Sequence, residues 1–154
     1  QFEERTVSKV YWAVVEGSVQ PAEGTWVDHL HKRHGMAEAI VVSEDDPRGK
    51  LAIMHYRTRE TVNNCTWLEI ELETGRTHQI RVQAASRGLP IMGDAQYGAQ
   101  LPFGHQHKDI RQRAIALHAR TLGFAHPMTR EPVEVTAPVS AAWQALGLPG
   151  VPAS

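Results

Sequence analysis

The sequence predicts a single domain built mainly of β-strands with a few short helices. Its 154 residues, 42% hydrophobic and 21% charged, suit one globular core. Short runs rich in β-branched and aromatic residues recur along the chain and end at glycine, proline or acidic residues. The chain contains no internal repeat and no low-complexity tract. We therefore expect residues 1–154 to form one domain.

Four strands are predicted in the first half of the chain, at residues 7–15, 37–42, 51–57 and 66–72. The last of these alternates, so Trp67 and Leu68 are expected on opposite faces of a sheet. Pro21 and Gly24 are typical of a loop, and the acidic run at residues 44–47 (EDDP) is typical of a turn.

A short helix is predicted after Thr74-Gly75, where the alternation ends. Thr77 is the expected N-cap, and Gly88 is well placed to end the helix in a left-handed conformation. Residues 93–110 resemble a loop because they are rich in glycine and proline. A hairpin and a final short helix complete the expected elements, at residues 120–124, 132–136 and 140–146.

Composition excludes several classes of protein. The single cysteine, Cys65, allows no disulfide within the chain and is expected to be buried in a reducing compartment. No apolar run approaches the ~20 residues of a membrane span and no signal peptide is present, so we expect a cytoplasmic protein without membrane contact. The formal net charge of -1 is unusual for a nucleic-acid-binding protein, although local basic clusters permit that function.

Two adjoining segments carry a specific pattern, TGRTHQIRV at residues 74–82 and GLPIMGDAQYG at residues 88–98. They resemble the "GRTHQIRVH…G.PI.GD..YG" signature of the RluA-type RNA pseudouridine synthases. Shorter flanking segments resemble the same family in the same order: FEERTVSKVYWAVVEG from Phe2, LHA from Leu117 and FAHP from Phe124. The resemblance extends from about Phe2 to Pro138.

The resemblance implies an α+β fold with a mixed, largely antiparallel, bent sheet and a few short helices. It also implies isomerisation of uridine to pseudouridine in ribosomal or transfer RNA, without a cofactor. RNA is then the expected partner, and the target uridine must leave its stack before it reacts.

The same resemblance implies roles for individual residues. Tyr11 matches the active-site tyrosine, whose ring can stack on uracil and whose hydroxyl can assist proton transfer. Arg81 matches the arginine that pairs with a catalytic aspartate and keeps it ionised. A core tyrosine and an exposed helix arginine are the alternatives. The residues expected to contact RNA are Arg76, Thr77, His78 and Lys9.

Two departures from the family pattern matter. Gln83 stands where histidine is usual, and the "HRLD..TSG" motif with the nucleophilic aspartate is absent from the sequence. We therefore expect the C-terminal part of a catalytic domain that is inactive alone. The missing upstream segment or a second copy is expected to cover an exposed sheet edge. A non-catalytic RNA-binding paralogue is the alternative.

The histidines suggest a third and least favoured interpretation, an unrelated metal-dependent hydrolase. His29, His31 and His34 form H-x-H-x-x-H, and His105 and His107 form a second pair. Zinc sites usually combine histidine with cysteine or carboxylate ligands. We therefore predict no metal site and interpret these residues as loop histidines.

Overall fold

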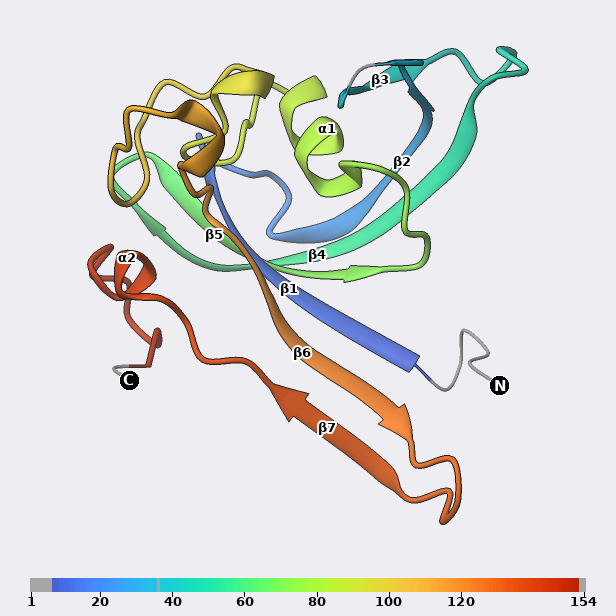
Figure 1. Cartoon of the computed structure of the whole chain (residues 1–154), viewed down its shortest axis with the longest axis vertical. Helices are drawn as coiled ribbons and strands as arrows, with labels where there is room; N and C mark the ends of the chain where they lie inside the picture. The colour runs from blue at the N-terminus through green and yellow to red at the C-terminus, as the bar shows by residue number, and fades with distance from the viewer. Residues whose placement is uncertain (1–6, 36, 153–154) are drawn as a thin grey trace.

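The structure is a computed structural model that describes residues 7–35 and 37–152. Phe2, where the resemblance to the family begins, lies outside the described residues. Seven strands form one sheet in the order β3–β2–β4–β5–β1–β6–β7, and every neighbouring pair is antiparallel (Figure 1). The strands are β1 (Val7–Glu16), β2 (Glu23–Lys32), β3 (Ala39–Val42), β4 (Lys50–Val62), β5 (Cys65–Leu72), β6 (Leu117–Ala125) and β7 (Pro132–Thr136).

Two short α-helices lie on opposite faces of this sheet. Helix α1 (Gln79–Ser86) covers one face, and α2 (Ala141–Gln144) contacts the other through Trp143, whose ring centroid lies 6.1 Å from that of Trp12. Two 3₁₀ turns, η1 (Ala95–Tyr97) and η2 (Ile110–Gln112), lie in the long connection between α1 and β6. The predicted α+β class with a largely antiparallel sheet is therefore confirmed.

The core is centred on β1 and β5, the middle strands of the sheet. Trp67 and Leu68 point to opposite faces, as predicted, and both are almost completely buried. Burying side chains of this size stabilises the fold by roughly 1.5–3 kcal/mol each. Cys65 is buried as expected and forms no disulfide. Because both faces of the central strands are covered, this part of the sheet provides a rigid base for α1.

Several sequence expectations were wrong. The region around Gly24 was predicted as a loop, but it forms the ten-residue strand β2, in which His29 and His31 pair with β3 and are not loop histidines. Its polar residues lie on both faces of the strand, as the neighbours Asp28 and His29 show, so no regular alternation marked this strand in the sequence. Thr77 is not the N-cap of α1: His78 occupies that position. The last helix begins at Ala141 after Ser140, as expected, but is only four residues long.

One end of the sheet extends away from the rest of the molecule. Figure 1 shows the start of β1, with β6 and β7, projecting beyond the other strands. β7 is an edge strand; Val135 on β7 exposes 53% of its surface, and Leu122 on the neighbouring β6 exposes 37%. Exposed edges of this kind are normally protected in native proteins. The covering of this edge by an upstream segment or a second copy stays a prediction.

Candidate functional site

The turn before α1 is held by the buried side chain of Gln79. Its Oε1 accepts hydrogen bonds from Thr74 Oγ1 at 2.8 Å and from the backbone N–H of Arg76 at 3.0 Å. Its Nε2 donates to the carbonyl of Ile53 on β4 at 3.1 Å. Much of the TGRTHQ segment therefore has a structural role, because it attaches the start of α1 to β4.

Helix α1 begins after a residue in an unusual conformation. His78 has φ 52° and ψ 28°, in the left-handed region that non-glycine residues seldom adopt. Its side chain makes no capping hydrogen bond; Nδ1 instead lies 2.8 Å from the hydroxyl of Tyr97. Burial is the main cause that lowers the pKa of His78, with a further contribution from Arg81.

Arg81 forms a two-point ion pair with a buried carboxylate. Its Nε donates to Asp94 Oδ2 at 2.9 Å, and its Nη2 donates to Asp94 Oδ1 at 2.7 Å. The Asp94 side chain is only 1% exposed, and that of Arg81 is 18% exposed. The hydrogen bonds to Asp94 raise the pKa of the Arg81 guanidinium above its already high usual value. Nη1 has no hydrogen-bond partner among the residues the structure describes.

Asp94 is positioned by the segment that joins α1 to η1. Ile91 bridges to Val15, and the Asp94 N–H donates to the Ile91 carbonyl at 2.9 Å. Gly93 precedes it with φ 88°, and a Cβ at that position would lie 2.8 Å from Phe103 Cβ. A glycine is therefore required next to Asp94 for both conformational and steric reasons.

Residues of η1 connect the Arg81 ion pair to the β2–β3 hairpin. Tyr97 accepts a hydrogen bond from the backbone N–H of Ala39 at 2.9 Å, and its ring centroid lies 5.0 Å from the Arg81 guanidinium carbon. Gln96 accepts from Arg81 Nη2 at 3.1 Å and donates to the Ala37 carbonyl at 2.5 Å. Burial raises the pKa of the Tyr97 hydroxyl, which keeps it protonated.

A cavity of about 640 Å³ is lined by His78, Arg81, Asp94 and Gln96 among others, and its volume is in the ~300–1,000 Å³ range of small-molecule sites. Arg81 contributes from α1 and His78 from the position just before it, and Asp94 is the only carboxylate of the cavity among the described residues. The remaining lining residues come from the Ala37 turn and from the connection between α1 and β6, which includes η1. Sequence reasoning gave no role to Asp94, Gln96 or Tyr97, although "GD..YG" in the family signature already contained two of them.

The other predicted site residues lie outside this cavity. Tyr11 is half-buried on β1 and pairs with Ile70, which in turn pairs with Tyr56, so its side chain is on the face that α1 covers. Lys9 is exposed on β1, and Thr77 is exposed just before α1. Arg76 is exposed and donates from Nε to the Leu51 carbonyl at 2.8 Å. The structure thus brings His78 and Arg81 together in the cavity.

Gln83, the departure from the family pattern, has a structural explanation. It is completely buried, and its Nε2 donates to Asp28 Oδ2 at 2.9 Å and to the Trp26 carbonyl at 3.2 Å. Asp28 also pairs with Arg87 at 2.6 Å. Gln83 therefore anchors α1 to β2.

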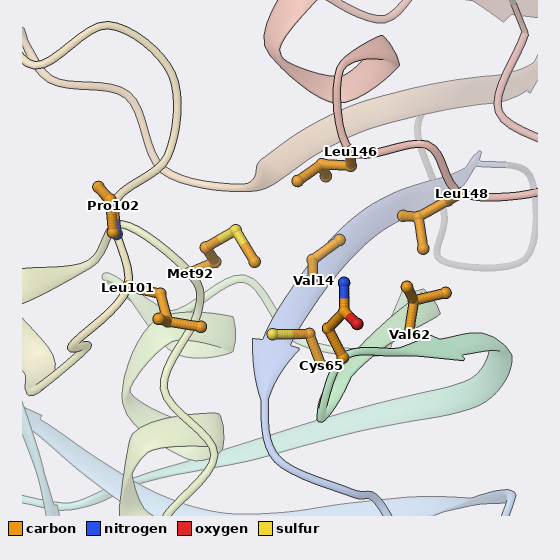
Figure 2. Close-up of a pocket in the computed structure, with 9 residues that line it drawn as sticks. Val14, Val62, Cys65, Met92, Leu101, Pro102, Leu146 and Leu148 are labelled. Carbon is orange, nitrogen blue, oxygen red and sulfur yellow. The ribbon is translucent and has the colours of Figure 1, made fainter.

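A second cavity, of about 260 Å³, is mostly apolar. Figure 2 shows its lining, which comes from β1, from the β4–β5 turn and from segments near Pro102 and Leu146. Burial is the main cause that raises the pKa of the Cys65 thiol, which keeps it protonated and unreactive. The polar cavity at Arg81 is therefore the better candidate site.

Across residues 7–35 and 37–152, no group of three or more histidine, cysteine, aspartate or glutamate side chains is arranged to hold a metal ion. The rings of His105 and His107 contact each other, with centroids 4.3 Å apart. No helix of the described chain combines the length and apolarity needed to cross a membrane.

Comparison with known proteins identifies the family. The family model for RNA pseudouridylate synthase matches residues 1–86. The ribosomal large subunit pseudouridine synthase D of Xanthomonas campestris is 41% identical over 145 residues, which cover 90% of this chain and 43% of the relative. An uncharacterized RNA pseudouridine synthase of Synechocystis sp. is 33% identical over 146 residues, covering 95% of this chain and 43% of the relative.

A solved structure shows the same fold. Human RNA pseudouridylate synthase domain containing 1 superposes with a TM-score of 0.67 at 24% identity, covering 88% of this chain and 56% of that chain. The chain thus spans less than half the length of the two bacterial relatives. Because the family model covers more than half of its residues, the chain belongs to the RNA pseudouridylate synthase family, as its RluA-type signature indicated.

Proposed function

We propose that the enzyme containing this chain isomerises uridine to pseudouridine in ribosomal or transfer RNA, with the cytoplasm as its place of action. The observation that carries the proposal is the Arg81 guanidinium, held by Asp94 at the wall of a cavity large enough for a nucleotide. Family membership supplies the reaction class.

Arg81 would orient the nucleophilic carboxylate of the complete enzyme and stabilise its ionised form. Its Nε and Nη2 are bound to Asp94, whereas Nη1 carries two N–H donors with no partner among the described residues. A second carboxylate that approached Nη1 would be stabilised in its charged form. Asp94 then acts as a positioning residue, because it fixes the plane of the guanidinium.

The 154-residue chain alone is proposed to be inactive. Its sequence contains no His-Arg-Leu-Asp run, and Asp94 is the only carboxylate that lines the cavity among the described residues. Both Asp94 oxygens are bound to Arg81, and the side chain is 1% exposed, so it cannot attack a substrate without breaking that ion pair.

Tritium release from RNA labelled at uridine C5 tests both statements. The full-length enzyme should release tritium, and the 154-residue chain should not. Robust turnover by the chain alone would show that the nucleophile lies within it. Absence of turnover by the full-length enzyme on ribosomal and transfer RNA, with RNA binding retained, would support a non-catalytic RNA-binding function instead.

Substitutions in the full-length enzyme test the proposed site. Arg81→Lys retains the charge but loses the planar two-point contact, so turnover should fall despite the conservative change. Tyr11→Phe should retain RNA binding, because the ring remains, and should lose turnover if the hydroxyl transfers a proton. Turnover of Arg81→Lys and Tyr11→Phe within a few-fold of wild type would contradict the assignment. Val135→Thr, an exposed change on β7, is the control.

A further inference from the structure

His78 occupies a backbone conformation that does not benefit the helix it precedes. The left-handed region costs a non-glycine residue roughly 1–2 kcal/mol, whereas N-cap residues usually have an extended backbone and cap the helix with a side-chain oxygen. His78 makes no such bond. Strain of this kind persists where the side chain is required elsewhere.

The hydrogen bonds of Tyr97 determine which ring nitrogen of His78 carries the proton. The Tyr97 oxygen accepts from the Ala39 N–H, so its single proton is available for His78 Nδ1 at 2.8 Å. The opposite tautomer would leave the half-buried Tyr97 hydroxyl without an acceptor among the described residues. This arrangement favours the tautomer of His78 that is protonated on Nε2 and accepts at Nδ1.

The surroundings also keep the imidazole uncharged near neutral pH. Burial lowers the pKa of His78, and so do Arg81 on α1 and Lys32 on β2. Asp94 acts in the opposite direction but is already paired with Arg81. The uncharged form agrees with the tautomer, because an imidazolium could not accept a proton from Tyr97.

The cavity beside the ring combines cationic and uncharged hydrogen-bonding groups, and the His78 ring is one of the uncharged groups. His78 Nε2 has no partner in the part of the chain that the structure describes, and the ring lines the cavity. The Arg81 charge is matched by Asp94, whereas Arg113, which also lines the cavity, forms no salt bridge among the described residues; three glutamines complete much of the polar lining: Gln96, Gln100 and Gln106. Arg113 suits an RNA phosphate, whereas the uncharged Nε2–H of His78 suits the edge of a nucleobase, which presents neutral donors and acceptors.

We propose that His78 is an uncharged hydrogen-bond donor, oriented by Tyr97, that binds a carbonyl oxygen of an unpaired RNA base in this cavity. The inference rests on the proposed function for its ligand, RNA, and specifies a base as the part of the RNA that His78 contacts. Tyr97 is a positioning residue in this arrangement, since it reaches the RNA only through His78.

The tautomer is tested first, on the 154-residue chain labelled with ¹⁵N-histidine. At neutral pH the NMR spectrum should show a proton on Nε2 of His78 and none on Nδ1. Tyr97→Phe should raise the pKa of His78, because it removes a donor that stabilises the neutral ring. A proton on Nδ1, or an unchanged pKa in Tyr97→Phe, would overturn the inference.

The base contact is tested with uridine pentanucleotides, one intact and five that each lack a single base. His78→Asn, which tolerates the left-handed backbone, should weaken binding of the intact RNA about five- to tenfold, the value of one hydrogen bond. It should have no effect on the one RNA whose contacted base is missing. His55→Asn, on the opposite face of the sheet, is the matched control.

If His78→Asn weakened binding of all five base-deleted RNAs equally, the contact would be to the RNA backbone and the inference would be overturned. So would a His78 Nε2 signal that no pentanucleotide shifts at the highest soluble concentration. Neither result affects tritium release by the full-length enzyme, so the base contact and the proposed function can fail separately.

Discussion

The ion pair between Arg81 and Asp94 makes a quantitative prediction about stability. Arg81→Ala leaves the Asp94 carboxylate, whose side chain is 1% exposed, without its two charge-assisted hydrogen bonds. Removing one partner of a buried pair costs about 3–5 kcal/mol. The Arg81 side chain is 18% exposed and borders an open cavity, so water can partly solvate Asp94. We therefore expect a loss of about 3 kcal/mol, at the lower end of that range.

Arg81→Lys should lower the free energy of unfolding about half as much as Arg81→Ala does, because an ammonium group retains the charge and one hydrogen bond but not the second. The double variant Arg81→Ala/Asp94→Ala should be less destabilised than the sum of the single variants, since no unpaired charge remains buried. A coupling free energy of about 1–3 kcal/mol is expected for residues in direct contact.

Urea unfolding followed by tryptophan fluorescence measures these free energies, and thermal unfolding offers a second assay. A loss of 3 kcal/mol should lower Tm by about 6–12 °C for a domain of this size. If the free energy of unfolding of Arg81→Ala were within about 0.5 kcal/mol of that of wild type, Asp94 would have to be protonated or solvated in the native state. The reasoning from the buried ion pair would then be refuted.

Two further predictions concern the same region. Gly93→Ala should be more destabilising than Gly98→Ala by about 1–3 kcal/mol: both have positive φ, but a Cβ at Gly93 meets Phe103 and one at Gly98 meets nothing within 4 Å. Equal Tm values for the two variants would contradict this. Because the folded-state pKa of His78 is lowered, its contribution to stability is present above the ordinary value of 6.5 and is lost as pH falls through the folded pKa. Urea unfolding at about pH 7.5 and 5.5, on either side of the usual histidine pKa, measures this effect. The free energy of unfolding should fall more between these pH values for wild type than for His78→Asn. Equal falls for the two proteins would contradict the prediction.

Local sequence patterns predicted the elements whose residues carry their own signal. The apolar run of β1, the alternation of β5 and the glycine after α1 were each legible because burial or backbone conformation demands those residue types. β2 was missed because its polar residues become strand only when β3 and β4 pair with it on both sides. Pairing between distant segments is a tertiary property that no local pattern records.

The sequence by itself determined the family and the presence of Arg81 and His78, since the RluA-type signature lists them in order. Only the tertiary structure decided what these side chains bind. Arg81 meets Asp94, and His78 meets Tyr97, across separations of 13 and 19 residues. Both contacts depend on a left-handed residue before α1 and a close backbone approach at Gly93. Those conformations are stable only when packing against the sheet compensates their cost, which is why the sequence could name the residues but not their partners.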